Sequence, residues 1–327
     1  MALSITSSPT SPHPAFNPAL LVVSATTETD VTITINAIQR KREVFSGVAT
    51  FDLSSVVKKL FVEGLTEINA AENASGNKAY TDGLLSVAYT AGILSGTQSP
   101  YIALNAVKQA GESSSFASLS DKLLTGFASL RNFAGYPQYV SVLSASTTVI
   151  TCKSTTADVA SVAGAAPGRV VVAMIAGVAP YRVQTASDYR DINNYDAPEN
   201  PFFVRWINRM GGWDYWMFAG RQQKSFELSD QQTFRPHVAN QETARGYTAQ
   251  VAAQASGTIK VGTEGLTENE FDNITALIYS PRIEWYNESL SKWLIVTVKK
   301  SGIESDTSEP QKAIEVTFEL PTHQLQH

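Results

Sequence analysis

The chain has 327 residues, of which 43% are hydrophobic and 17% are charged, and its formal net charge at pH 7 is −5. This is the composition of a packed globular protein of one large or two medium domains, with few charges available for its surface. The acidic balance argues against a protein that wraps nucleic acid or docks on an anionic membrane, because either partner selects a basic excess. We therefore expect neither nucleic acid nor a membrane as a partner.

Residues 1–19 are rich in Ser, Thr and Pro and lack hydrophobic periodicity, which predicts an extended N-terminal arm. They have no basic head and no apolar run, so they do not read as a secretory signal. No stretch of the chain approaches the ~18 apolar residues that cross a bilayer. We expect a protein that is made in a cytoplasm and then stays soluble or enters an assembly.

Residues 20–145 are predicted to form the first of two β-rich domains. Between Val31 and Asn36, apolar residues alternate with threonine, which is the period-2 pattern of a half-buried strand. The segment Phe51–Phe61 changes to helical spacing, and a second short helix is predicted at Asp121–Phe133. Further strands are predicted at Leu20–Ser24, Leu84–Tyr89, Tyr101–Val107 and Val140–Ser144.

Residues 146–327 are predicted to form the second β-rich domain, with the boundary near residue 145. The segment Tyr247–Val261 reads as a long strand or a second hairpin, broken near Ser256-Gly257. Other strands are predicted at Val149–Lys153, Arg169–Ile175, Arg282–Asn287, Trp293–Lys299 and Ile314–Leu320. The last of these alternates cleanly between apolar and polar residues.

The best-marked helix is predicted at Glu268–Tyr279. Thr267 and Glu270 have the Thr-x-x-Glu spacing of a capping box, in which each side chain accepts a hydrogen bond from the other residue's backbone N–H. Phe271 and Ile274 begin the stripe that should face the core.

The segment from Asn200 to Phe218 holds three of the five tryptophans and reads as two strands joined at Gly211-Gly212. A Gly-Gly pair readily supplies the positive φ values of a tight hairpin turn. The predicted register pairs Met210 with Trp213, Asn208 with Tyr215, Trp206 with Met217 and Arg209 with Asp214.

Both faces of this hairpin are apolar, so both must be covered. One predicted face carries Trp206, Met210, Trp213, Tyr215 and Met217, and the other carries Phe203, Ile207, Trp216 and Phe218. One side can be the domain's own core, and the other can meet a second sheet, a neighbouring subunit or a ligand. The residues singled out for contact with a partner are Trp206, Trp213, Trp216 and Tyr215. Their structural interpretation is burial in a sandwich core, and their functional one is a platform for sugars.

No catalytic motif stands out along the chain. There is no phosphate-binding glycine loop, no Gly-x-Ser-x-Gly elbow and no His-Glu-x-x-His. Cys152, the single cysteine, lies in a strand-like setting and reads as a small apolar residue. His237, beside Arg235 and Pro236, reads as a polar loop residue. We therefore expect no catalytic residue, no cofactor and no metal.

One acidic segment lies between Ser187 and Asn200. Four carboxylates in it could gather around a hard cation, namely Asp188, Asp191, Asp196 and Glu199. Their spacing does not match a twelve-residue calcium loop, and the favoured interpretation is a solvated loop. Two carboxylates across a cleft would also suit a glycoside hydrolase, but the sequence cannot set their separation.

About a dozen short strands with two or three helices predict a mainly β protein of two sandwich- or barrel-like domains. The segment NPFFVRWINRMGGWDYWMFAGRQ resembles a stretch that recurs in structural proteins of tailed bacteriophages and prophages. The segments YIALNAVKQ and LLTGFASLRNFAGYPQYVSVL have the same character. The Thr-x-x-Glu helix, LIYSPRIEWYN, KWLIVTV and the final alternating strand resemble the end of distal-tail or baseplate proteins. The resemblance covers about two thirds of the chain, without the N-terminal arm and the acidic segment.

This resemblance implies a virion structural protein of a tailed phage, without enzymatic activity. It would be made in the host cytoplasm and form a homo-oligomeric ring at the tail tip or baseplate that links the tail tube to adhesion components. Its partners would be further copies of itself and other phage tail proteins. The alternatives are another virion structural protein of the capsid or neck, a carbohydrate-binding module that uses the tryptophans, and a glycoside hydrolase. Contact with a glycan is unproven.

Overall fold

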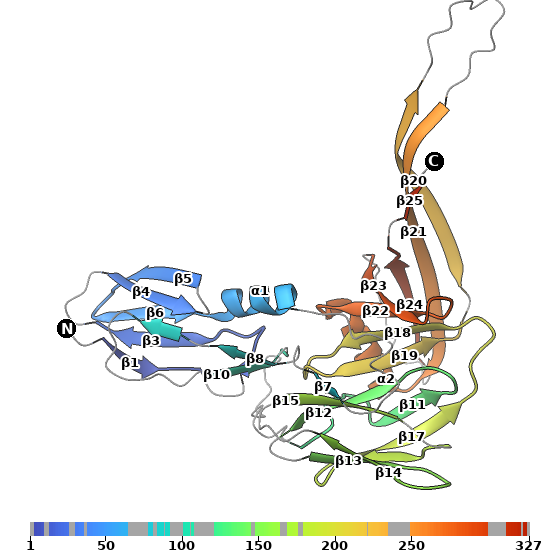
Figure 1. Ribbon diagram of the computed structural model, residues 1–327, viewed down its shortest axis with the longest axis horizontal. Coiled ribbons are helices and arrows are strands. Elements are labelled where there is room, and N and C mark those ends of the chain that lie inside the picture. The colour runs from blue at the N-terminus through green and yellow to red at the C-terminus, as the bar shows by residue number, and fades with distance from the viewer. Residues whose placement is uncertain are drawn as a thin grey trace, which may run out of the picture. The chain divides into compact units, whose positions relative to one another are not determined.

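The structure of the chain, a computed structural model, is described for residues 3–9, 13–25, 30–35, 38–64, 78–80, 84–87, 89–91, 101–104, 106–107, 121–144, 148–163, 169–175, 179–220, 222–234, 249–299, 312–321 and 323–325. Within this part the protein is mainly β, with two α-helices and one short 3-10 helix (Figure 1). The predicted fold class is confirmed.

The chain divides into two compact units. The first comprises residues 1–196 and 207–214, and the second comprises residues 197–206 and 215–327. The division does not fall near residue 145, where the sequence placed it. The strands β11 (Ser129–Phe133) and β17 (Tyr189–Tyr195) pair in parallel, so that segments on both sides of residue 145 belong to one sheet.

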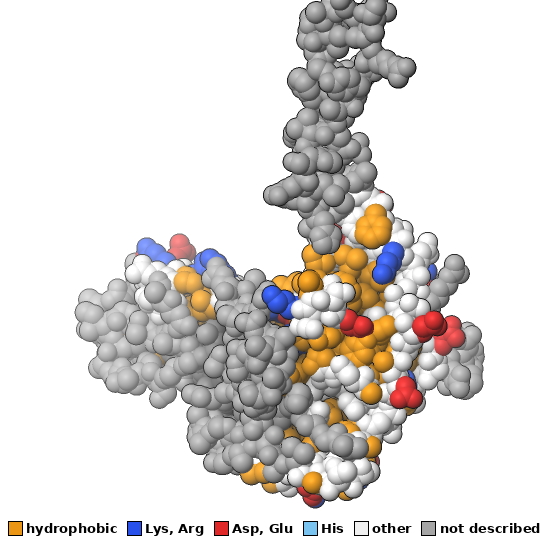
Figure 2. Space-filling model, turned by 45° about the vertical axis from the view of Figure 1, so that its right-hand side comes forward, with side chains coloured by type: hydrophobic (Ala, Val, Ile, Leu, Met, Phe, Trp, Pro, Cys, Tyr) orange, Lys and Arg blue, Asp and Glu red, His pale blue; other side chains and the backbone are white. Residues whose placement is uncertain are grey.

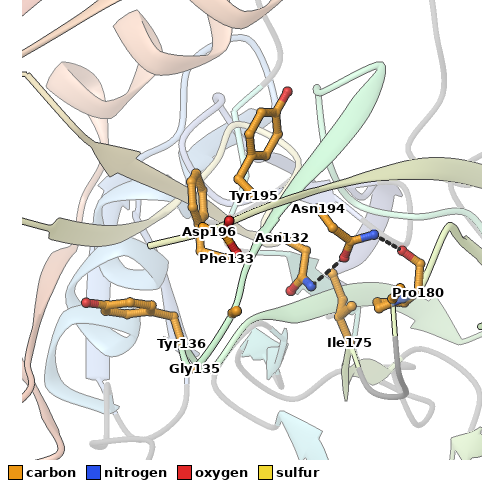
Figure 3. A pocket seen from close by; sticks show the side chains of 11 residues that line it. Asn132, Phe133, Gly135, Tyr136, Ile175, Pro180, Asn194, Tyr195 and Asp196 are labelled. Carbon is orange, nitrogen blue, oxygen red and sulfur yellow. Dashed lines mark hydrogen bonds between the residues drawn. The ribbon is translucent and has the colours of Figure 1, made fainter. Parts of the chain in front are cut away.

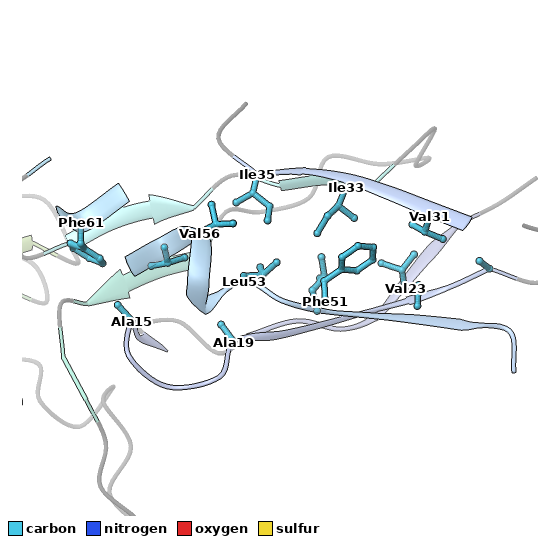
Figure 4. Packing of buried hydrophobic residues seen from close by; sticks show 14 residues of the cluster. Ala15, Ala19, Val23, Val31, Ile33, Ile35, Phe51, Leu53, Val56 and Phe61 are labelled. Atoms are coloured by element: carbon cyan, nitrogen blue, oxygen red, sulfur yellow. The ribbon is translucent and has the colours of Figure 1, made fainter. Parts of the chain in front are cut away.

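The first unit begins with a small β-sandwich. One sheet has the order β1-β3-β6 and the other the order β5-β4-β9. Their bounds are Ser4–Ser7 (β1), Leu20–Ser24 (β3), Val48–Asp52 (β6), Ile38–Glu43 (β5), Asp30–Ile35 (β4) and Tyr89–Ala91 (β9). Ile33 and Ile35 of β4 point toward Phe51 of β6 and Leu53 across a shared core (Figure 4). The alternation in the sequence thus identified both the strand and its buried side.

The described part of the predicted arm pairs with strands of the first unit. Strand β1 pairs antiparallel with β3, and β2 (His13–Pro14) pairs in parallel with β10 (Tyr101–Leu104). Ala15 and Ala19 are 2% exposed and lie in the sandwich core. The backbone is extended, as expected, but it lies on this chain's own strands.

Helix α1 (Ser54–Gly64) begins within the predicted helical segment Phe51–Phe61. Phe51 and Asp52 are the last residues of β6 and pair with β3. The carboxylate of Asp52 accepts a hydrogen bond from the backbone N–H of Ser54 at 2.9 Å, which caps the helix start. The predicted apolar stripe faces the core, with Val56, Val57 and Phe61 buried.

The rest of the first unit contains three further sheets, with the orders β2-β10-β8, β12-β15-β7 and β11-β17-β16-β13-β14. The remaining bounds are Leu84–Val87 (β8), Tyr139–Ser144 (β12), Arg169–Met174 (β15), Lys78–Tyr80 (β7), Arg182–Gln184 (β16), Thr148–Lys153 (β13) and Val159–Ala163 (β14). The predicted strands at Val140–Ser144, Val149–Lys153 and Arg169–Ile175 are confirmed.

The helix predicted at Asp121–Phe133 is wrong. Residues 121–128 form an irregular segment, and strand β11 follows it. Two backbone hydrogen bonds hold this segment against β12, from Asp121 to Leu143 at 2.7 Å and from Leu124 to Ser141 at 2.7 Å. These long-range bonds hold the segment on β12 in an irregular conformation, so tertiary pairing overrides a weak local helix preference.

The second unit is dominated by one curled sheet with the order β19-β18-β22-β23-β24-β21-β20, in which β25 also pairs with β21. The bounds are Trp213–Phe218 (β19), Phe202–Ile207 (β18), Ile283–Asn287 (β22), Lys292–Val298 (β23), Lys312–Glu319 (β24), Ala249–Leu266 (β21), Gln223–Phe234 (β20) and His323–Leu325 (β25). The N–H of Gly220, just after β19, donates to the carbonyl of Gly262 on β21 at 3.0 Å. The sheet therefore curls toward a half-barrel. Strand β21 runs without the break predicted near Ser256-Gly257.

The C-terminal helix is confirmed, with its capping box. It consists of α2 (Glu268–Thr275) followed by the 3-10 turn η4 (Ala276–Tyr279). The Thr267 hydroxyl accepts from the Glu270 N–H at 3.3 Å, and the Glu270 carboxylate accepts from the Thr267 N–H at 3.0 Å. Phe271 and Ile274 are buried, as the stripe predicted.

A buried cluster of charged side chains links strands β18 and β22 of the curled sheet. Arg205 of β18 lies directly opposite Glu284 of β22 and donates from Nε to its carboxylate at 2.6 Å. Arg282 donates to the other carboxylate oxygen at 2.5 Å, and the Arg205 guanidinium lies 4.2 Å from the ring centroid of Trp293. Arg205 and Glu284 are 1% and 2% exposed, so each charge depends on the other for compensation.

Replacing Glu284 by Gln should destabilise the protein by about 3–5 kcal/mol, because two arginines would lose their buried counter-charge. Asp191→Asn is the matched control, since it breaks the exposed Arg182–Asp191 pair of the same chemistry. That loss should stay below about 1 kcal/mol. Urea denaturation of both variants beside the parent measures the difference. Equal losses would contradict the role given to Glu284.

Thr267→Ala should lower the free energy of unfolding by about 1 kcal/mol, because it removes the hydroxyl of the capping box. Phe271→Ala should lower it by about 3–5 kcal/mol, because it leaves a cavity beside the curled sheet. Thr267→Ser keeps the hydroxyl and serves as the control. Chemical denaturation compares the four proteins, and small, equal losses for the two alanine variants would show that α2 does not pack on this core.

Candidate functional site

Asn208 sets the turn of the tryptophan-rich hairpin, and the predicted register is wrong. The Asn208 N–H donates to the Gly212 carbonyl at 2.8 Å, so Asn208 lies opposite Gly212 and not opposite Tyr215. Its side-chain oxygen accepts from the N–H groups of Met210 at 2.9 Å and Gly212 at 3.1 Å. The loop therefore has three residues, from Arg209 to Gly211, and the Asn208 side chain holds it closed.

The two glycines of the turn meet different constraints. Gly211 has φ of 84°, a left-handed conformation that favours glycine. Gly212 lies so close to a neighbouring segment that an added Cβ would be 2.2 Å from the backbone oxygen of Leu124. The same oxygen accepts a 2.7 Å hydrogen bond from the Asn208 amide. The hairpin tip is thus docked on the irregular segment 121–128.

The shift in register changes which side chains share a face. Phe202 and Phe218 both contact Phe318, with ring centroids 5.3 Å and 6.0 Å apart. Phe203 contacts Tyr215 at 5.9 Å, although the predicted register placed these two rings on opposite faces. Both also contact Trp293. Every residue of β18 and β19 is buried, so both faces of the hairpin are covered.

The residues singled out for contact with a partner lie inside the protein. Trp206 is 0% exposed, Trp213 and Trp216 are 2% exposed, and Tyr215 is 7% exposed. Their rings therefore offer no open face to a sugar or to a partner in this structure. The observation supports the structural interpretation, and the contact role given to these four residues is not carried further.

Asp214 has a different partner from the one that the sequence suggested. Its carboxylate accepts from the Thr125 hydroxyl at 2.6 Å, whereas the sequence paired it with Arg209. Burial raises its pKa to about 7, against the opposing effect of hydrogen bonds from Thr125, Asn208 and the Gly126 N–H. Asp214 and Thr125 are 89 positions apart, so no local pattern could have identified the contact.

The middle of the acidic segment, Tyr189–Tyr195, is strand β17 and not the solvated loop predicted for it, whereas residues 196–200 lie outside any strand. Each carboxylate has a separate surrounding. Asp188 accepts from the Leu123 N–H at 3.1 Å and pairs with Arg190 at 2.6 Å. Asp191 pairs with Arg182 at 2.8 Å, while Asp196 and Glu199 are exposed. Within the described residues, no group of three or more His, Cys, Asp or Glu side chains is placed to hold a metal ion.

The remaining candidates for chemistry are single residues. Cys152 is buried in β13, in the strand predicted for it. His13 donates from Nε2 to the Pro18 carbonyl at 3.2 Å, and burial lowers its pKa. His237 lies outside the described residues.

The most prominent surface feature that sequence reasoning missed is a long two-stranded ribbon. Strand β20 pairs with β21 from Gln223–Lys260 to Phe234–Ala249, while β24 pairs with β21 only from Thr258 onward. Strand β25 pairs with β21 at residues 253–255, so the ribbon extends past the other strands of the sheet only at its outer end (Figure 1). A two-stranded ribbon is marginally stable alone in water, so its outer part favours additional contacts.

Strand β20 lies at the end of the strand order and exposes its residues 223–227. Phe226 is 69% exposed and lies across from Gly257, where an added Cβ would be 3.1 Å from its ring. Figure 2 shows a face of the molecule on which hydrophobic side chains gather and charged ones are sparse. An exposed strand edge with an aromatic side chain on it is a template for another strand.

No model of a known protein family matches the chain, and no curated protein matches its sequence. The resemblance to phage tail proteins therefore stays a prediction. Among the described residues, no helix combines the length and the apolar character that crossing a membrane requires.

Asp214→Asn should make the free energy of unfolding less dependent on pH as the pH rises. The pKa of Asp214 is about 7 in the folded chain, against an ordinary value of 3.8. Between these two pH values the folded state therefore keeps the proton that the unfolded chain has lost. The associated stability is complete below about pH 4 and is lost as the pH rises through about 7, which amounts to about 3 kcal/mol between pH 5 and pH 8. Asparagine mimics the protonated carboxyl, with one donor and one acceptor group.

Urea denaturation at pH 5 and pH 8 measures this difference. The parent and the exposed-site control Asp191→Asn should both lose about 3 kcal/mol of unfolding free energy between pH 5 and pH 8, and Asp214→Asn should not. A variant that loses as much as the parent would show that Asp214 titrates in its ordinary range.

Proposed function

We propose that the chain is a virion structural protein of a tailed phage. In this proposal it forms a homo-oligomeric ring at the tail tip or baseplate and links the tail tube to adhesion components. It is made in the host cytoplasm and ends in the virion tail. Its function is assembly, with no enzymatic step, and its partners are other copies of itself and other tail proteins.

The observation that carries the proposal is the exposed edge of β20, on a ribbon whose outer end extends past strands β24 and β25. An unpaired edge adds a strand from another molecule through main-chain hydrogen bonds. When the surfaces that pair are different on the two molecules, the contact repeats and closes into a ring if the rotation permits. The low charged fraction of 17% and the resemblance of the Asn200–Gln222 segment to tail proteins support the same reading.

The alternatives differ in how far the structure supports them. A capsid or neck protein would use the same kind of exposed edge, and only the resemblance of the C-terminal run favours the tail tip. A carbohydrate-binding module was suggested by the tryptophans, and those side chains are buried. No feature of the described residues favours a glycoside hydrolase over assembly.

Phe226→Lys tests the proposal. The substitution places a charge on the exposed edge, where it should prevent close packing of a second strand and leave the fold intact, because Phe226 is 69% exposed. Tyr279→Lys is the control, since Tyr279 is 84% exposed but lies in η4, away from the ribbon.

Light scattering after size-exclusion chromatography gives the mass at micromolar concentration, and negative-stain electron microscopy gives the shape. The parent and Tyr279→Lys should be multimers with a central opening, and Phe226→Lys should be a smaller species with unchanged melting. A parent that is monomeric both in solution and in assembled tail particles would refute the ring, and an intact ring of Phe226→Lys would remove β20 from its interface.

A further inference from the structure

The first unit contains a pocket that neither the sequence analysis nor the proposed assembly uses. It lies where β11 and β17 end, has a volume of about 440 Å³, and is bordered by Asn132, Phe133, Tyr136, Asn194, Tyr195 and Asp196 (Figure 3). This volume is within the range of small-molecule sites in proteins.

The parallel pairing of β11 and β17 brings the lining residues together. Asn132 lies beside Asn194 and Phe133 beside Tyr195, because the two strands run in the same direction and end at the same edge. The chain then turns through Gly135, whose φ is 87°, and the Ala134 N–H donates to the Tyr195 carbonyl at 3.2 Å. The walls of the pocket therefore rest on backbone pairing.

One wall is a chain of oriented amides. Asn194 donates from Nδ2 to the Pro180 carbonyl at 2.7 Å, which fixes its side-chain oxygen toward Asn132. Asn132 then donates to that oxygen at 2.9 Å and directs its own Oδ1 away from Asn194 (Figure 3). Each amide orientation is set by the one before it. The pocket thus presents an ordered polar edge before any ligand arrives.

The opposite wall is aromatic. Phe133 and Tyr195 stack with centroids 5.7 Å apart and planes at 29°, and the Tyr136 ring lies beside them (Figure 3). The Arg131 guanidinium lies 5.3 Å from the centroid of the Tyr195 ring. Tyr195 is 42% exposed, so a large aromatic surface meets solvent at the pocket mouth. The carboxylate of Asp196 adds a strong acceptor beside these rings.

A ligand that suits these walls has an apolar face for the rings and several hydroxyl groups at its edge for the amides and the carboxylate. A pyranose ring has both properties. An anionic ligand suits the site less well, because Asp196 lines the pocket and the chain carries a net charge of −5. We infer that this pocket binds a neutral sugar unit of an oligosaccharide, with the apolar side of the sugar against the exposed part of the aromatic wall and Asn132 and Asp196 bonded to its hydroxyls.

Saturation-transfer NMR on the full chain tests the inference with maltose, cellobiose, lactose and chitobiose as probes and adenosine monophosphate as a comparison. At least one sugar should receive magnetisation from the parent protein. Tyr195→Ala should weaken its binding at least tenfold. Tyr189→Ala is the matched control, because Tyr189 lies on the same strand and is 55% exposed but does not line the pocket.

Asp196→Ala provides a second variant at an exposed position, in case Tyr195→Ala melts at a lower temperature than the parent. It should also weaken sugar binding, while its melting stays that of the parent. The inference is overturned if no sugar shows transfer, if adenosine monophosphate alone does, or if a folded pocket variant binds as well as Tyr189→Ala. None of these outcomes depends on whether the chain forms a ring.

Discussion

The burial of the β18–β19 hairpin on both faces is the interaction on which the rest of the structure depends. Its tip, residues 207–214, is counted with the first unit, and most of its two strands belong to the second. The strands carry Phe202, Trp206, Trp216 and Phe218 among their fully or almost fully buried side chains, and every residue of both strands is buried. Because large aromatic side chains dominate core energetics, both units draw on the same short segment for their stability.

Two buried carboxylates, Asp214 on the hairpin and Glu284 on the neighbouring strand β22, are stabilised in opposite ways. The Glu284 carboxylate accepts hydrogen bonds from the guanidinium groups of Arg205 and Arg282, and these two positive charges compensate it. Asp214 has no guanidinium among its hydrogen-bond partners, and its pKa rises until the neutral form prevails at mildly acidic pH. A buried charge is tolerated when it is paired, and otherwise the group neutralises.

Local patterns predicted the parts of the fold that depend on local physics. The Thr267–Glu270 capping box and the alternation of Ile314, Val316 and Phe318 identify their elements because a few neighbouring residues decide them. The segment after Asp121 and the acidic segment before Tyr195 were misread, because backbone pairing with distant strands decides their conformation. The hairpin was identified correctly, but its turn lies at residues 209–211 and not at Gly211-Gly212, because the Asn208 side chain closes a three-residue loop.

The candidate sites were harder to predict than the fold. The ribbon of β20 has no strong apolar pattern in its described part, since a strand exposed on both faces needs none. The pocket joins Asn132 to Asn194 across 62 positions, and it exists because two strands end at the same sheet edge. The composition of the chain and the spacing of its residues do not show which strands end at the same edge of a sheet. The tryptophans drew attention in the sequence because they are large and rare, and the structure uses them as core.

The sharing of the hairpin has a consequence for the order in which the chain folds. The first unit needs residues 207–214, which follow residues 197–206 of the second unit in synthesis. Its parallel pair β11–β17 also closes a loop of about 60 residues, a non-local contact that forms slowly. A nascent chain therefore cannot finish its first unit before it has begun the second. The two units are coupled during biosynthesis, and the unfinished first unit exposes strand edges that a chaperone or a neighbouring nascent chain would meet first.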